Sequence, residues 1–266
     1  MTKKFRNYIN SDRQDMVQQT YKKNHTNMTV EHVNNMHKKW LQFNHGKYSI
    51  EDILNLVDTI IDDSDPDVSL PNTVHAFQTA ESLRKKYPDK DWLHLIGLIH
   101  DLGKVMCCWG EPQWNVVGDT YPVGCAFSDK IVFSELFSDN PNLKNDIYSS
   151  KLGIYKEYCG LSNLIMSWGH DEYMFQVLKY NNCKIPKEGL NIIRYHSYYS
   201  WHTENSYSYL INNDDKETLF WVKCFNDHDL YTKSDVIYNN TERKQLWESY
   251  YKNLCKKYGI GEKLFW

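Results

Sequence analysis

The sequence contains no apolar segment long enough to cross a membrane. A membrane-spanning helix needs about 20 consecutive apolar residues, whereas this 266-residue chain has a mean hydropathy of −0.68 and charges throughout its length. The first six residues, MTKKFR, also lack the apolar core of a secretory signal. We therefore expect a soluble, cytoplasmic protein with no membrane partner.

An excess of basic charge is also absent. The chain has 31 Lys and Arg residues against 34 Asp and Glu, which gives a net charge of −3. A nucleic-acid-binding domain would carry a basic patch. Only five residues are arginine, so no arginine cluster is available to bind phosphates. The composition argues against nucleic acid as a partner and suits a small, uncharged, polar substrate.

Cysteine is too scattered for a disulfide framework. The seven cysteines are odd in number, and the adjacent Cys107 and Cys108 do not have the spacing of a zinc site. We expect reduced thiols, as is typical of a reducing compartment.

The sequence is rich, by contrast, in helical patterns. Apolar residues recur at helical spacing in most of the chain, and this predicts helices around 12–23 and 29–40, after Ser49 and Pro71, up to His100, from 162 to 170, after Pro186, from about 217, and near the C-terminus. Glycines and prolines between 109 and 127 predict a long ordered loop, with at most a short β-hairpin near Gly118. Because no linker or repeat interrupts the pattern, we predict an all-α fold: one mainly helical domain.

His100 and Asp101 lie side by side at the end of one predicted helix. Leu93, Ile96 and His100 fall at i, i+3 and i+7, so His100 shares the buried face. A buried carboxylate must be paired, hydrogen-bonded or bound to metal. If the helix continues for one turn, Lys104 lies beside both residues. On its own, a His-Asp dipeptide is more often an ordinary helix end.

Other predicted helices direct further metal-binding side chains inward. His75, His170 and His196 lie at apolar or boundary positions, and Asp229 occupies an apolar stripe. Together with the pair above, they give four imidazoles and two carboxylates, which are hard to satisfy by hydrogen bonds alone. Nitrogen and oxygen donors without thiolate suit iron, manganese or zinc, and two ions bridged by one aspartate explain the number of donors. We expect Asp171 to support His170 rather than to bind metal.

An acidic run from Asp62 to Asp67 follows the helix that begins after Ser49. Such a run is usually a solvated turn. Its carboxylates could equally accept hydrogen bonds from a hydroxyl-rich ligand. The residues alone leave both interpretations open.

Longer strings around these residues resemble a known family. A histidine, a His-Asp pair 25 residues later and a distant aspartate form the metal pattern of the helical HD-domain superfamily. Within it, the chain resembles the myo-inositol oxygenase family through FRNY from position 5, DPD from 65, PNTVHAFQTAE from 71, HDLGK from 100, WGEPQW from 109, GDT from 118, MSWGHDEY from 166, RYHS from 194 and DLYTK from 229. This similarity runs over nearly the whole chain.

The resemblance implies an oxidoreductase with a non-haem di-iron centre. In this family, two iron ions in a mixed-valent Fe(II)/Fe(III) state cleave the ring of myo-inositol with O2 as co-substrate and yield D-glucuronate, a dioxygenase reaction of inositol catabolism. The first iron would be bound by His75, His100, Asp101 and Asp229. Asp101 would bridge to the second iron, which His170 and His196 complete.

The resemblance also implies roles for the surrounding residues. Lys104 and Asp101 would act in catalysis. Substrate contacts would come from Arg6, Asp62, Asp63, Ser64, Lys104, Gly118, Asp119, His196, Ser197 and Lys233. Residues 1–48 would form an N-terminal lid segment and outer helices, and residues 49–266 an HD-type helical catalytic core, in a monomeric protein.

Two other functions compete with this hypothesis. An HD-domain phosphohydrolase acting on a nucleotide or another phosphate ester would use His75, His100, Asp101 and Asp229 to activate water. The scarcity of arginine argues against it. A catalytically silent helical scaffold is the second competitor, and the complete set of metal-binding residues argues against that.

Overall fold

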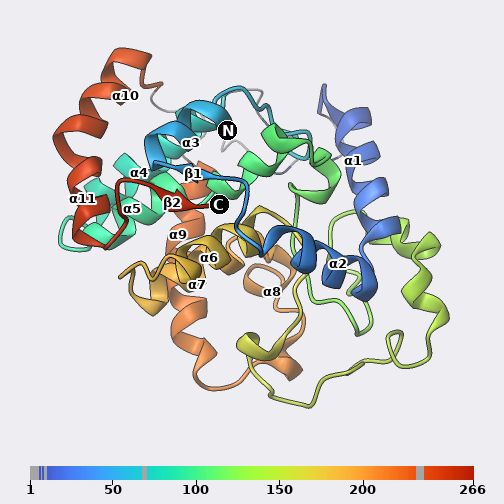
Figure 1. Ribbon diagram of the computed structural model, residues 1–266. Helices are drawn as coiled ribbons and strands as arrows, with labels where there is room; N and C mark the ends of the chain where they lie inside the picture. Colours follow the sequence, from blue (N-terminus) through green and yellow to red (C-terminus); the bar gives the residue numbers. More distant parts are fainter. Residues whose placement is uncertain (1–5, 7, 9–10, 68–70, 232–236) are drawn as a thin grey trace, which may run out of the picture.

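Helices form most of the computed structural model shown in Figure 1. The structure describes residues 6, 8, 11–67, 71–231 and 237–266. Within these ranges the α-helices are α1 (Gln14–Asn27), α2 (Val30–Trp40), α3 (Ile50–Val57), α4 (Asn72–Lys86), α5 (Asp91–Ile99), α6 (His170–Tyr180), α7 (Lys187–Tyr195), α8 (Tyr199–His202), α9 (Asp215–Tyr231), α10 (Asn240–Leu246) and α11 (Lys252–Lys257).

Shorter helical turns connect these helices. They are the 3₁₀ helices Leu102–Trp109, Gln113–Asn115, Ser134–Asp139, Pro141–Lys144, Leu161–Asn163 and Ser208–Leu210, and a π-helical turn, Trp247–Tyr251, between α10 and α11.

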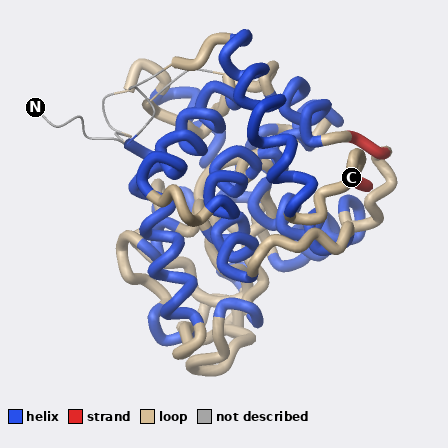
Figure 2. Tube along the Cα trace, turned by 90° about the vertical axis from the view of Figure 1, so that its left-hand side faces the viewer, coloured by secondary structure: helices blue, strands red, loops and turns tan. Residues whose placement is uncertain are grey.

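Only one small sheet is present among the described residues. Strand β1 (Lys47–Tyr48) pairs antiparallel with β2 (Leu264–Phe265), so that Lys47 lies opposite Phe265. Figure 2 shows the two short strands together beside the C-terminus. The predicted all-α fold is therefore confirmed.

The predicted hairpin near Gly118 is not formed. Instead, this loop pairs with a distant segment: the Val123 amide donates to the Ile165 carbonyl over 2.9 Å, and the Ser167 amide donates to the Tyr121 carbonyl over 2.7 Å. Because the backbone groups of Tyr121 and Val123 bond to this distant segment, they are not available for a hairpin within the loop.

The same pairing corrects a second prediction, that of a helix from Ser162 to His170. Leu161–Asn163 is a single 3₁₀ turn, Met166 forms an isolated bridge with Pro122, and α6 begins only at His170. Leu164, Met166 and Trp168 are buried, but in a segment whose backbone pairs with the loop at 121–123 rather than along a helical face. A short apolar run does not distinguish these two outcomes.

Local signals explain the ends of several helices. Ser49 and Asp52 form the predicted capping box, in which each side chain bonds the other residue's amide at the start of α3. The Thr29 hydroxyl accepts from the His32 amide at the start of α2. These predicted starts are confirmed.

The central helices approach one another closely. α4 packs on α5, α6 on α7, and α7 on α9. At Gly97 an added Cβ would lie 2.7 Å from the Ala80 Cα, and at Gly103 it would lie 2.1 Å from the His170 carbonyl oxygen. Both glycines allow backbones to meet where any side chain would collide.

Two further expectations concern the chain as a whole. All seven cysteines are free. No helix among the described residues is both long and apolar enough to span a membrane. The division of the chain at residue 48 stays a prediction.

Candidate metal centre

Two histidines cap the C-terminal ends of α5 and α7. His100 directly follows α5, and its Nδ1 lies 2.9 Å from the Gly97 carbonyl; His196 directly follows α7, and its Nδ1 lies 2.9 Å from the Ile193 carbonyl. The last carbonyls of a helix lack partners within it, so these imidazoles act as donors to them. With Nδ1 protonated, each Nε2 is left as a lone-pair donor.

His170 reaches the same point from the start of α6. Its Nδ1 lies 2.7 Å from the Val116 carbonyl, which again leaves Nε2 to face the site. The Nε2 atoms of His170 and His196 lie 3.3 Å apart. All three of these imidazoles are buried.

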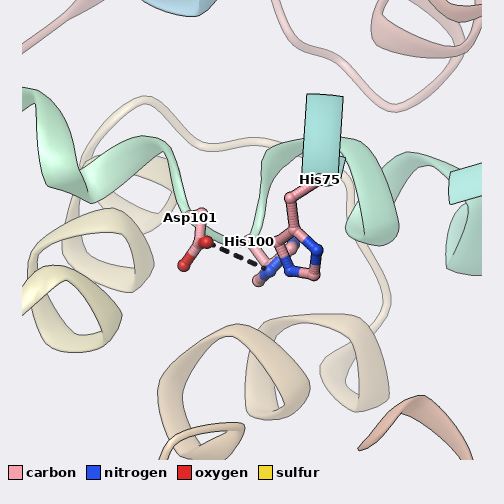
Figure 3. Close-up of side chains that lie close together, drawn as sticks. All are labelled: His75, His100 and Asp101. Carbon is pink, nitrogen blue, oxygen red and sulfur yellow. Dashed lines mark ion pairs between the residues drawn. The ribbon is translucent and has the colours of Figure 1, made fainter. Parts of the chain in front are cut away.

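Asp101 lies between two groups of histidines. Its Oδ1 is 3.2 Å from His170 Nε2 and 3.6 Å from His196 Nε2, while its Oδ2 is 3.5 Å from His100 Nε2. Figure 3 shows this carboxylate beside the imidazoles of His100 and His75. The clusters His75–His100–Asp101 and Asp101–His170–His196 thus share one aspartate.

Asp229, near the end of α9, completes the first group. Its Oδ1 lies 2.7 Å from His75 Nε2 and 3.3 Å from His100 Nε2. All six predicted metal-binding residues therefore converge on one place, although they come from five separate parts of the chain.

The electrostatics suit a cation. Burial raises the pKa of the Asp101 carboxyl, but Lys104 and the surrounding histidines together outweigh burial and hold that pKa well below its usual range. The two histidines beside Asp229 likewise hold its pKa well below the usual range despite burial. Burial lowers the pKa of His170, yet the neighbouring carboxylates overcome this and raise the pKa to about 10. Without metal, His170 is therefore the imidazolium, with protons on both ring nitrogens, and an incoming ion would displace the proton on Nε2.

The donor set fits a pair of metal ions. His100 Nε2 is buried and makes no hydrogen bond among the described residues. A buried donor atom of this kind demands a partner. Imidazole nitrogens and carboxylate oxygens without a thiolate suit iron, and a shared carboxylate can bridge two ions.

Lys104 lies beside the bridge, as its spacing predicted. Its Nζ is 2.9 Å from Asp101 Oδ2, 2.7 Å from Asp62 Oδ2 and 3.3 Å from Asn72 Oδ1. Asp62 in turn accepts from the amide and hydroxyl of Ser64, at 2.8 and 2.6 Å. This part of the acidic run is therefore an ordered wall of the site rather than a solvated turn.

A second ion pair also lines the cavity. The Arg6 guanidinium donates to both oxygens of Asp119, at 2.9 and 2.7 Å, and its Cζ lies 3.5 Å from the centre of the Tyr199 ring. The Tyr21 hydroxyl also donates to Asp119, over 3.0 Å. Arg6 has a φ of +58°, a conformation that a non-glycine residue keeps only when its surroundings fix it.

Asp171 connects the metal-binding residues to Ser197. Its Oδ1 lies 2.7 Å from His170 Nε2 and accepts from the Ser197 hydroxyl at 3.1 Å, and its Oδ2 accepts from the Ser197 amide at 3.2 Å. Asp171 therefore contacts the same His170 nitrogen that faces the site, and its supporting role stays a prediction.

A cavity of about 90 Å³ lies at the centre of these groups. The predicted residues that line it are Arg6, Asp62, Ser64, His75, His100, Asp101, Lys104, Gly118, Asp119, His170, His196, Ser197 and Asp229. Asp63 is not among the lining residues; its amide instead donates to Gln113 Oε1. Lys233 lies outside the described residues.

Sequence reasoning assigned no individual role to several lining residues, namely Tyr8, Tyr21, Pro66, Asn72 and Tyr199, and considered Asp65 only as part of the acidic run. The family-like strings contain Tyr8, Asp65, Pro66 and Asn72, and this was an available signal. Tyr21 and Tyr199 lie outside those strings, and nothing in a single sequence distinguishes them from the other 18 of the 20 tyrosines.

Comparison with known proteins agrees with this geometry. The family model "Myo-inositol oxygenase" matches residues 14–266. Inositol oxygenase of Danio rerio is 50% identical over 97% of this chain and 91% of its own length, and that of Homo sapiens is 48% identical over 97% and 89%. Inositol oxygenase 1 of Arabidopsis thaliana is 49% identical over 98% of this chain and 84% of its own length. The chain belongs to the myo-inositol oxygenase family.

Proposed function

We propose that this chain is an inositol oxygenase that uses two iron ions and O2 to convert myo-inositol into D-glucuronate. The observation that carries the proposal is the bridged donor set, in which one buried aspartate is shared by two histidine clusters. Family membership gives the reaction. The balance is one inositol and one O2 to one glucuronate and one water.

The first iron would be held by His75, His100, Asp229 and one oxygen of Asp101. The second would be held by His170, His196 and the other oxygen of Asp101. When bound, the irons supply the one-electron chemistry that lets O2 react with a polyol. The second site has fewer protein donors, and this leaves room for two adjacent hydroxyl oxygens of the substrate.

The chain's own residues would bind and orient the ring. Asp62, Asp119 and Ser197 offer oxygens to hydroxyl groups that would otherwise be buried without partners, and such groups reject ligands that lack a matching hydroxyl. Lys104, whose pKa the two adjacent carboxylates raise in spite of its burial, keeps its proton. It would stabilise negative charge on the substrate oxygen that ionises.

Further contacts follow the family pattern. We assign substrate contacts also to Arg6, Ser64, Gly118, His196 and Lys233. The assignment of Asp63 has only the family pattern behind it, because Asp63 does not line the cavity. An amino-terminal lid, a cytoplasmic location and a monomeric state belong to the same proposal.

The rival phosphohydrolase function is disfavoured by the paired state of the cations that line the cavity. Among the described lining residues, Arg6 is bound to Asp119 on both oxygens, and Lys104 lies between Asp62 and Asp101. A phosphate would meet carboxylates next to each cation, and like charges repel it.

Oxygen uptake tests the proposal. We expect the iron-reconstituted, partially reduced protein to consume O2 only with myo-inositol and to form about one D-glucuronate per O2. His170→Ala and His196→Ala should abolish this oxygen uptake. The control is His228→Ala: His228 is next to Asp229 in sequence, but its side chain contacts Ser82, so this variant should keep the activity. No uptake by protein shown to hold two irons, or release of phosphate from an ester, would refute the proposal.

A further inference from the structure

Glu172 and Arg194 belong to the family-like strings but have no part in the chemistry proposed above. Glu172 follows His170 by two residues in α6, and Arg194 precedes His196 by two residues in α7. The Arg194 Nε donates to Glu172 Oε2 over 2.6 Å, and the two side chains are only 14% and 3% exposed. The pair therefore joins the two helices that carry the histidines of the second cluster.

The pair is held firmly by its surroundings. The second carboxylate oxygen of Glu172 accepts from Gln176 Nε2 over 2.6 Å. The Arg194 guanidinium lies over the Phe175 ring at 4.6 Å and donates to the Tyr195 hydroxyl over 3.2 Å. With both oxygens of Glu172 and a face of the guanidinium engaged, neither group can turn without losing several contacts.

A second tie between the same segments lies on the side of the cavity. Asp171, next to Glu172, binds the amide and hydroxyl of Ser197, which follows His196. Successive residues of an α-helix point about 100° apart around the axis. The ties through Asp171 and Glu172 therefore restrain α6 from two directions, and together they restrict rotation of α6 relative to the end of α7.

Burial makes a purely stabilising role a poor explanation. Removing two charges from water costs about as much as their attraction returns, so apolar side chains would serve stability equally well. A charged, directional contact does restrict geometry, and metal sites tolerate errors of only about 0.2 Å in donor position. His170 and His196, which lie two residues from Glu172 and Arg194, must meet that tolerance if they bind a metal ion.

We propose that Glu172 and Arg194 are positioning residues that set the separation of His170 and His196 for the second metal ion. This inference rests on the proposed function. Loss of the pair allows α6 to turn against α7 and spoils the second site, while His75, His100 and Asp229, carried by α4, the end of α5 and α9, keep the first site intact.

Titration of the metal-free protein with iron(II) alone, without oxygen, tests this inference. Wild-type protein should bind two ions. In Glu172→Gln, which keeps the shape and removes the charge, the second ion should bind about 10-fold more weakly, at the low end of the range for loss of a group bonded to a metal ligand, because the pair acts through α6 and α7. The first ion should bind unchanged. Arg194→Lys keeps the charge but loses the Nε–H and should give the same pattern.

Glu111→Gln is the matched control. Glu111 is also a buried carboxylate, bound to Lys39, Trp40 and Asn115, but it does not connect α6 to α7. The Glu111→Gln variant should have a lower thermal unfolding temperature and unchanged affinities for both iron ions.

The possible outcomes distinguish the positioning role of Glu172 and Arg194 from the di-iron function. If Glu172→Gln and Arg194→Lys lower only the unfolding temperature, like the control, and bind the second ion as tightly as wild type, the inference is wrong. If Glu172→Gln does not fold, Arg194→Lys decides by the same criterion. If wild-type protein binds fewer than two ions, the di-iron function itself fails.

Discussion

Lys104 is held on several sides by the polar groups of the site. It is buried between Asp62 and Asp101 and touches Asn72. Lys104→Gln removes a fixed positive charge next to the carboxylate that joins the two clusters. We expect kcat for inositol-dependent oxygen uptake to fall about 100- to 1000-fold, as is typical when one charge-stabilising donor is lost.

Lys39→Gln is the control for that variant. Lys39 is half exposed, pairs with Glu111 and does not line the cavity, so its loss should leave kcat unchanged. A Lys104→Gln enzyme with wild-type kcat would show that this lysine only holds the fold together.

His25 predicts how stability depends on pH. It is fully buried, stacks on Phe137 and bonds the Val132 carbonyl, and burial lowers its pKa to about 4. The unfolded chain takes up this proton below about pH 6.5, but the folded chain does so only below about pH 4. The contribution of His25 is therefore complete above pH 6.5 and is lost as the pH falls toward 4.

Urea unfolding at pH 7 and pH 5 measures this contribution. Between these values the wild-type protein should lose about 2 kcal/mol more of its free energy of unfolding than His25→Gln does, because the glutamine cannot titrate. An equal loss in both proteins would contradict the assignment. Since His25 does not itself line the cavity, oxygen uptake at pH 7 should be similar in both.

At the scale of elements, the site depends on how closely the 3₁₀ helix Leu102–Trp109 approaches the start of α6. Gly103 meets the His170 carbonyl there, and an added Cβ would lie 2.1 Å from that oxygen. Gly103→Ala must push α6 away. We expect it to cost about 3 kcal/mol of unfolding free energy and to abolish binding of the second ion.

Gly261→Ala provides the comparison, because an added Cβ at Gly261 would meet nothing closer than 3.7 Å. Its free energy of unfolding should change by less than about 0.5 kcal/mol. Unfolding curves and iron analysis of both variants check the prediction. A Gly103→Ala protein that retains two ions would mean that α6 is not fixed at this point.

At the scale of the whole molecule, the C-terminus closes the fold. β2 pairs with β1, the Trp266 amide donates to the Gly46 carbonyl, and the Trp266 ring is fully buried beside Trp109 and Tyr173. Trp266→Ala should therefore destabilise the protein by about 3–5 kcal/mol.

Phe265→Ala is the natural control for Trp266→Ala. Phe265 is adjacent but 42% exposed, so its loss should cost less than about 1 kcal/mol. Urea unfolding compares the two variants. Equal effects would show that burial of Trp266 is not what secures the chain end.

Much of this architecture could be predicted from local patterns. The capping box at Ser49 and the apolar stripes predicted most helix positions. The metal-binding candidates were also found from local patterns: His75, His100, Asp101, His170, His196 and Asp229. Local chemistry determines these features, since capping and helical periodicity act over only a few residues.

Two predictions failed because their outcome depended on distant partners. The segment at 164–168 is not helical, and the loop at 118–123 forms no hairpin, since each pairs with the other across more than 40 residues of sequence. A hydrogen bond between remote segments leaves no periodicity in either one.

The sequence by itself determined which residue types this protein uses: imidazoles and carboxylates on apolar helix faces, with few arginines and no cysteine pattern. Tertiary structure alone decided how they meet. It pointed both oxygens of Asp101 toward different clusters, stacked Tyr199 on Arg6, and tied Glu172 to Arg194. The physical reason is that distances between helix ends follow from packing of the whole core, in which every side chain constrains its neighbours.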